Sequence, residues 1–305
     1  MSGMKAGQIR ALWQAVGGRE EPPASGSGAL GLPAIEDAAA LAGLTLVALG
    51  LPIDGPAGAP GAVRRMSRRY SGWLPELDAG FRAGDYGDVD VARDDHAVAF
   101  MQAHDRLADI LAAGSAPLVL GGSPLVSVPV LQVLAGKLRG RLGVVAFTPA
   151  YEVAPVPLYS AQSRWARALE LGVVSPSSLV LVGGRAEPSD GPVRRLLDAI
   201  GATTFSLADV AQDGMAVIAQ EALETAASGT EAVYLSVDVA VLAGVGDPLG
   251  LTARELVAGV SIVSRSLLAA ADVCGCMQAT GQGDGVAEAA RVAAEIVAGV
   301  AGGIS

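Results

Sequence analysis

The sequence predicts an α/β protein with three layers: a mainly parallel sheet between two layers of helices. Short apolar runs rich in β-branched residues alternate along the chain with longer segments rich in Ala, Leu and Arg. This alternation is typical of repeated βαβ units around a parallel sheet. A length of 305 residues and a hydrophobic content of 51% are enough for a large core. We expect a single domain over residues 1–305, in which residues 1–40 are an N-terminal extension and loop.

The apolar runs give the expected strands, and the longer segments between them give the expected helices. Strands are expected at Leu44–Leu49, Ala116–Leu120, Leu142–Phe147, Leu179–Val182, Ala232–Val237 and Ala271–Cys276. Helices are expected at Asp94–Ala113, Pro129–Arg139, Gln162–Leu171, Pro192–Ala199, Met215–Ser228, Thr252–Ala270 and Gly285–Gly299. Asp94 and Thr252 suit N-cap positions, and Thr252 forms a capping box with Glu255. Arg19–Pro33, rich in Gly, Pro and Ser, is expected to be a surface loop.

Composition limits the partners and the compartment. The net charge of −10 argues against nucleic acid or an anionic membrane as a partner. Two cysteines cannot form a disulfide framework, so a reducing cytoplasm is the expected location. The N-terminus lacks the apolar run of a signal peptide. Gly and Pro interrupt the apolar stretch Ala38–Ile53, which favours a buried helix end and a strand over a membrane span.

Three strand ends carry polar residues. In an open parallel sheet, ligands bind beyond the carboxyl ends of the strands, so these residues are candidates for a site. The three segments are Gly121-Gly-Ser-Pro-Leu-Val-Ser127, Thr148-Pro-Ala-Tyr-Glu152 and Ser236-Val-Asp238.

These segments resemble the metal-binding segments of the ureohydrolase family, which includes arginase, agmatinase and formimidoylglutamase. The resemblance spans roughly residues 45–300 and implies the arginase-like fold, a pair of bound metal ions and assembly into trimers or hexamers. The family patterns are similar to Gly-Gly-Asp-His-Ser, Asp-Ala-His-x-Asp and Ser-x-Asp-x-Asp. This chain resembles a degenerate member of the family, because Ser123 and Pro124 stand at the Asp and His of the first pattern.

The other two segments have also lost coordinating side chains. Thr148 and Ala150 replace an Asp and a His, and Ala240 replaces an Asp. Of six expected ligands, Asp238 is unchanged and Glu152 is a conservative replacement. Two oxygens are too few for an enclosed manganese or zinc site. We therefore expect no metal, no other cofactor, and no metal-activated hydroxide for urea release.

The remaining acids define the expected site. If Glu152 and Asp238 lie close together with no cation between them, their repulsion raises one pKa, which suits acid–base catalysis or binding of a cationic ligand. Hydrogen bonds to a substrate are expected from Ser123, Thr148, Tyr151 and Ser236. The alternative is that Glu152 is a solvated loop acid and that Asp238 caps a turn.

Cys274 and Cys276 alternate on an expected strand, so we expect both side chains on the face opposite that of Gly275. A catalytic thiol needs a nearby base, and no His is close in sequence. The two cysteines are therefore expected to be small core residues.

Two functions remain open. In the first, the pocket is that of a metal-independent enzyme for a small amine- or guanidine-bearing metabolite, with Glu152 and Asp238 as catalytic or cation-binding groups. In the second, the protein is a non-catalytic relative that binds a ligand or partners an active homologue. A nucleotide-binding α/β protein, based on Gly121-Gly122, is a more distant third.

Overall fold

The structure is a computed structural model of the whole chain. It describes residues 28–53, 58–73, 80–91, 95–138, 142–154, 159–185, 191–246, 248–276 and 285–303.

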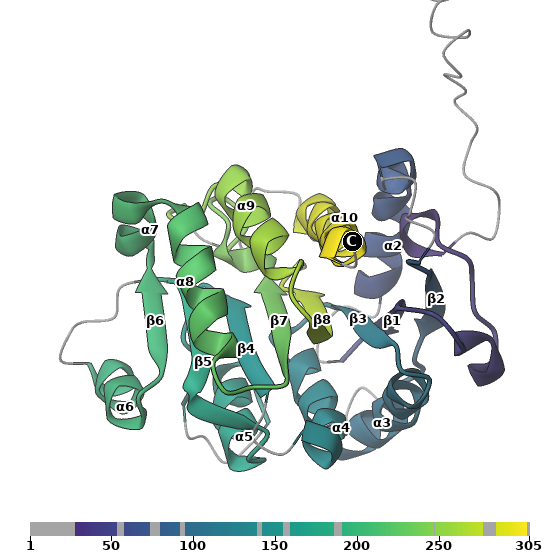
Figure 1. Ribbon diagram of the computed structural model, residues 1–305, viewed down its shortest axis with the longest axis horizontal. Coiled ribbons are helices and arrows are strands. Elements are labelled where there is room, and N and C mark those ends of the chain that lie inside the picture. Colours follow the sequence, from purple (N-terminus) through teal and green to yellow (C-terminus); the bar gives the residue numbers. More distant parts are fainter. Residues whose placement is uncertain are drawn as a thin grey trace, which may run out of the picture.

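A single parallel sheet of eight strands runs through the centre of the molecule, in the order β2-β1-β3-β8-β7-β4-β5-β6. The strands are β1 Leu46–Leu51, β2 Ala83–Asp88, β3 Ala116–Gly121, β4 Leu142–Phe147, β5 Val174–Gly184, β6 Thr203–Ser206, β7 Ala232–Asp238 and β8 Leu268–Cys274. Figure 1 shows the strands side by side across the middle of the molecule, with helices above and below them. Strands β1 and β4 are buried along their whole length, as expected for strands covered on both faces.

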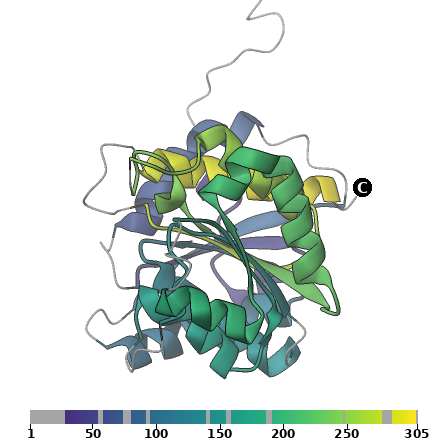
Figure 2. The same cartoon turned by 90° about the vertical axis from the view of Figure 1, so that its left-hand side faces the viewer.

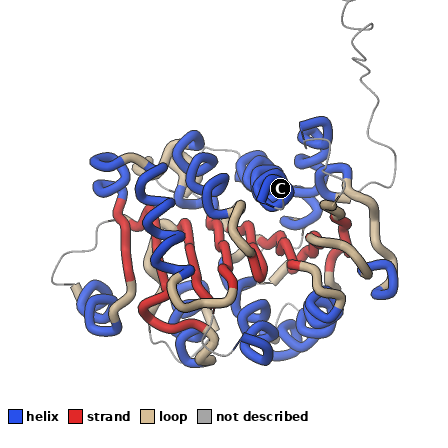
Figure 3. The backbone as a smooth tube through the Cα atoms, in the orientation of Figure 1, coloured by secondary structure: helices blue, strands red, loops and turns tan. Residues whose placement is uncertain are grey.

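Helices cover both faces of the sheet, as Figures 2 and 3 show. One face packs against α2 Ala59–Ser67, α8 Met215–Ala227, α9 Ala253–Val263 and α10 Gly285–Gly303. The opposite face packs against α3 His96–Ala112, α4 Ser127–Leu138 and α5 Arg164–Glu170. The shorter helices α6 Pro192–Ile200 and α7 Leu207–Asp213 flank β6. The expected three-layer, arginase-like α/β fold is therefore confirmed.

Most expected elements are present, with shifted ends. Strands β2 and β6 and helices α2 and α7 were not expected. The expected helix Thr252–Ala270 is too long, because α9 ends at Val263 and β8 begins at Leu268. The end of α9 is fixed by Ser266, whose amide and hydroxyl both donate to the Val263 carbonyl.

Of the two expected N-caps, Thr252 lies at the start of α9 and Asp94 lies near the start of α3 in sequence. The capping box is confirmed: the Thr252 hydroxyl accepts from the Glu255 amide at 3.2 Å, and the Glu255 carboxylate accepts from the Thr252 amide at 2.7 Å. Asp94 lies outside the described residues, and the N-cap of α3 is Asp95, whose carboxylate accepts from two amides of the first turn.

The expected position of the two cysteines is wrong. Cys274 packs in the hydrophobic cluster beneath α3 and α4, whereas Cys276 packs in the cluster beneath α10, so the side chains lie on opposite faces of the sheet. Gly275 lies between them with φ +75°, a left-handed conformation that breaks the alternation of a strand. Both cysteines are buried, as expected for core residues.

Part of the expected N-terminal loop packs on the domain. Residues 19–27 lie outside the described residues, but Leu30 is buried and Ala34 forms a bridge with Asp85 of β2. Asp85 accepts from the Ala29 amide at 2.6 Å and from Arg64 Nε at 2.7 Å. Within the described part of the chain, none of the helices is both long enough and apolar enough to cross a membrane.

Candidate functional site

A group of buried polar residues lies at the carboxyl ends of β3, β8, β7 and β4, in the middle of the sheet. Strands β3 and β4 follow each other in the chain but are separated in the sheet by β8 and β7. The helices that follow β3 and β4 lie on one face of the sheet, and those that follow β7 and β8 lie on the other. Ligands of open α/β sheets bind beyond the carboxyl ends of the strands at such a switch of face. The three polar strand ends expected from sequence converge here.

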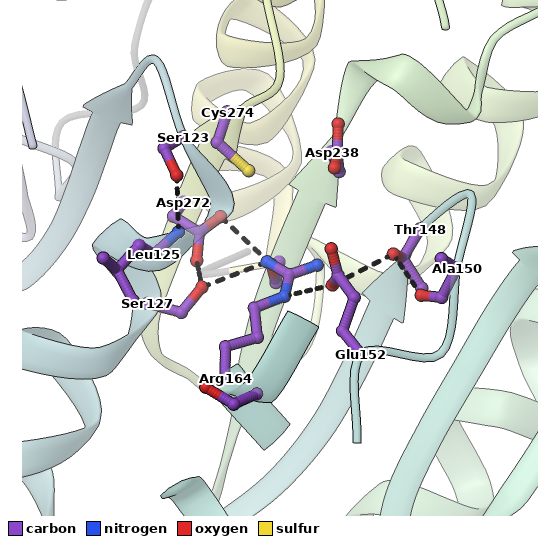
Figure 4. A network of polar contacts seen from close by, with 12 residues as sticks. Ser123, Leu125, Ser127, Thr148, Ala150, Glu152, Arg164, Asp238, Asp272 and Cys274 are labelled. Atoms are coloured by element: carbon purple, nitrogen blue, oxygen red, sulfur yellow. Dashed lines mark hydrogen bonds and ion pairs between the residues drawn. The ribbon is translucent and has the colours of Figure 1, made fainter. Parts of the chain in front are cut away.

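The centre of the group is Arg164, the first residue of α5. Its side chain is fully buried. Nε donates to the Glu152 carboxylate at 2.5 Å, and Nη1 donates to the hydroxyls of Ser127 at 3.2 Å and Ser236 at 3.0 Å. Figure 4 shows its guanidinium group between Ser127 and Asp272 on one side and Glu152 on the other. Burial acts to lower the pKa of Arg164, but the nearby carboxylates outweigh this and raise it, so the group stays charged.

Asp272 of β8 orients the two serine hydroxyls. It is fully buried and accepts from Ser127 at 2.7 Å, from Ser236 at 3.0 Å, and from the Tyr234 hydroxyl. A serine hydroxyl has a single proton, so both serines face Arg164 with lone pairs only. The hydrogen bonds therefore run in one direction: Arg164 donates to the serine hydroxyls, and these donate to Asp272.

Glu152 is a buried acid rather than a solvated one. Its side chain is 8% exposed, and Thr148 Oγ1 lies 3.3 Å from it. Burial raises the pKa of Glu152 to about 7; the charge of Arg164 acts to lower it, and Asp238 acts to raise it. Its backbone has φ +47°, a left-handed conformation that is uncommon outside glycine. Asp238 acts to raise the pKa of Glu152, which is the expected repulsion, and Arg164, which was not expected, acts to lower the pKa of both acids.

Asp238 ends β7 and caps the short turn Val239–Val241. Its Oδ1 accepts from the Ala240 amide at 2.9 Å. Its Oδ2 is buried with no hydrogen-bond partner among the described residues, as is Nη2 of Arg164. A Cβ at position 275 would overlap the Asp238 carboxylate, so Gly275 leaves the space that this carboxylate fills. Burial raises the pKa of Asp238, and the charge of Arg164 opposes this.

The four expected substrate-binding residues have different surroundings. Ser236 and Thr148 belong to the group, although Thr148 Oγ1 lies closer to the Ala150 carbonyl, at 2.7 Å, than to Glu152. Ser123 caps the turn after β3 by accepting from the Leu125 amide. Tyr151 is 3% exposed, and its ring packs against Gly184 within the hydrophobic core. A role in ligand binding stays a prediction for all four.

Sequence reasoning missed Arg164, Asp272, Ser127 and Tyr234. Asp272 had a usable signal, because an acid inside an apolar strand run is seldom buried without a partner. Arg164 had none: it is one of 21 basic residues and lies on no strand end. Its side chain enters the group from a helix on one face of the sheet.

Two large cavities among the described residues lie away from this group. One of about 520 Å³ is lined by Ser115, Ala232 and Leu268, at the opposite, amino ends of β3, β7 and β8. Another, of about 450 Å³, lies between α3 and Tyr159. Among the described residues, no three Asp, Glu, His or Cys side chains gather in a way that could hold a metal ion.

Comparison with known proteins agrees with the fold. The chain is 28% identical over 241 residues to an arginase from Brevibacillus brevis, covering 67% of this chain and 78% of that arginase. It superposes on a formimidoylglutamase from Bacillus subtilis with a TM-score of 0.78, at 18% identity over 95% of this chain and 98% of the other. It superposes on a proclavaminate amidino hydrolase from Streptomyces clavuligerus with a TM-score of 0.75, at 22% identity over 90% of this chain and 97% of the other. The model of the Arginase family matches residues 38–302, and the chain belongs to that family.

Proposed function

We propose that this chain is a non-catalytic member of the arginase family, in which a buried arginine occupies the centre that would otherwise hold metal ions. The observation that carries the proposal is the ion pair between Arg164 and Glu152 at the meeting point of the strand ends. A fixed positive charge there disfavours a divalent cation beside it. The donor set does not fit a dinuclear site either, because Pro124, Thr148, Ala150 and Ala240 stand at four ligand positions implied by the resemblance.

Burial of the polar group supports a structural role. Ser236 and Thr148 are 0% exposed, and Asp238 is 1% exposed. The cavities described above, of about 520 and 450 Å³, are lined by other residues. The protein then acts through its surface, by binding a ligand or an active homologue, and its assembly into trimers or hexamers stays a prediction from the resemblance.

The test is the metal content of protein expressed with added manganese, together with urea release from arginine and agmatine. We expect no stoichiometric manganese and no urea release. The matched control is an active arginase carried through the same purification, which must retain its metal. Stoichiometric metal with urea release would disprove the proposal.

A second candidate, a metal-independent enzyme for a small amine or guanidine, is favoured by Glu152. A carboxyl group with a pKa of about 7 suits proton transfer near neutral pH, and left-handed backbone at a non-glycine residue often marks a functional site. Thermal-shift screening with amines and guanidines tests this candidate. A compound that stabilises the wild type but neither Glu152→Ala nor Asp238→Ala would favour the enzyme, and turnover of that compound would establish it.

A further inference from the structure

The buried group contains more acids than bases. Asp238 and Asp272 are buried, the side chain of Glu152 is 8% exposed, and Arg164 is the cation that acts on the pKa of Glu152 and Asp238. A buried carboxylate is strongly unfavourable unless it is paired or protonated. The stability of this region therefore depends on a positive charge at the position of the Arg164 guanidinium.

The hydrogen bonds around that charge match a planar guanidinium group. The carboxylate of Glu152 accepts from Nε, and the two serine hydroxyls accept from Nη1. Because each serine hydroxyl donates its hydrogen bond to Asp272, its lone pairs point toward Arg164 in fixed directions. Nε and Nη1 of the rigid guanidinium fork have acceptors in this arrangement, whereas Nη2 has none among the described residues. An ammonium is a compact point charge and lacks this planar set of donors.

Arg164 is held in place by its own helix. The next residue, Trp165, is 0% exposed, and its amide donates to the Glu152 carbonyl at 3.2 Å. The guanidinium carbon lies 4.5 Å from the centre of the Trp165 ring. The backbone hydrogen bond of Trp165 positions the start of α5, and its buried ring contacts the guanidinium group.

We infer that the strand ends form a guanidinium-binding site that the chain fills with its own Arg164, which serves as a tethered cation for Glu152, Asp238 and Asp272. This inference rests on the proposed replacement of the metal centre. It adds a ligand class: once the side chain of Arg164 is removed, the vacated space binds a free guanidinium ion.

The experiment is chemical rescue of Arg164→Ala, measured as the thermal unfolding midpoint. Removal of a buried charge partner lowers the midpoint by about 10 °C. Guanidinium or methylguanidinium chloride at about 1–20 mM, far below the molar range of its denaturing action, restores part of that loss. Sodium chloride at equal ionic strength and the neutral planar analogue urea do not.

The matched control is Arg167→Ala, which removes the same side chain from the same helix. Arg167 pairs with the half-exposed Glu170 at 2.8 Å, outside the acidic group. Neither this variant nor the wild type is stabilised by guanidinium. The inference is overturned if Arg164→Ala is as stable as the wild type, if urea rescues it equally, or if manganese rescues it better than guanidinium.

A second pair of variants covers the case in which Arg164→Ala does not fold. Arg164→Met keeps a long side chain and removes its charge. The double variant R164M/E152Q removes both charges of the ion pair. We expect the double variant to unfold at a higher temperature than R164M, because it no longer buries the unpaired Glu152. A double variant no more stable than R164M overturns the inference. Rescue by guanidinium and the comparison of the two variants are both measured as thermal unfolding midpoints. Their outcome is therefore independent of the test of the proposed function by metal content and urea release.

Discussion

At the scale of a single residue, Glu152 is held in two unfavourable states, a left-handed backbone and a buried carboxyl group. The pKa of this carboxyl is raised from 4.5 to about 7, because burial disfavours its charged form. The folded state therefore binds its proton more tightly than the unfolded state. The resulting stability is fully present below pH 4.5 and is lost as the pH rises through about 7.

We therefore predict that Glu152→Gln flattens the pH dependence of stability between pH 5 and pH 8. The shift of this carboxyl corresponds to about 3 kcal/mol at most across that range. The measurement is the urea midpoint at several pH values, compared between wild type and variant.

Glu170→Gln is the control, because this acid is 56% exposed and belongs to a partly exposed ion pair. Its curve should run parallel to that of the wild type. If the Glu152→Gln curve is also parallel, Glu152 titrates near its ordinary pKa and the acid–base candidate loses its support.

The sequence identified two acids of the site, Glu152 and Asp238, but neither the third, Asp272, nor their partner Arg164. Glu152 and Asp238 could be predicted because they follow apolar strands at the edge where ligands bind. Arg164 could not, because a long side chain reaches a site from an element that no strand-end argument considers. The role of Gly275 was equally hidden, since only the fold shows that the Asp238 carboxylate fills the space beside it.

At the scale of elements, α9 depends on its capping box. The Thr252 hydroxyl and the Glu255 carboxylate each accept from the other residue's amide, which satisfies two of the free N–H groups at the helix start. We predict that Thr252→Ala lowers the free energy of unfolding by about 1 kcal/mol, measured by urea denaturation with an unchanged slope. Thr252→Ser keeps a capping hydroxyl and is the control. Equal losses in both variants would show that the cap is not the cause.

The elements that sequence reasoning found share one property: each carries a clear apolar period or run. Strand β4 was predicted to the residue, Leu142–Phe147. Strand β2 was missed because its sequence, Ala-Gly-Asp-Tyr-Gly-Asp, is not apolar. Its Asp85 is buried only because Arg64 and the Ala29 amide bind it, and such partners come from the tertiary fold.

At the scale of the whole molecule, the number of chains in the assembly is a prediction that rests on the family resemblance. The described surface exposes large apolar side chains, with Leu249 and Leu267 each 75% exposed. Surfaces of this kind are consistent with contacts between copies, although single exposed residues are common. We predict a mass of three or six times that of one chain, measured by light scattering after gel filtration at several concentrations. A mass of one chain at micromolar concentration would contradict the resemblance-based prediction.

The anchoring of Arg164 has a consequence for any attempt to engineer metal affinity into this centre. While the guanidinium stays, a coordinating side chain introduced beside it meets a fixed positive charge, which disfavours a divalent cation. Replacement of Arg164 alone removes that charge but leaves the buried Glu152 without its ion-pair partner. A designed metal site here therefore requires substitutions at Arg164 and at the coordinating positions together.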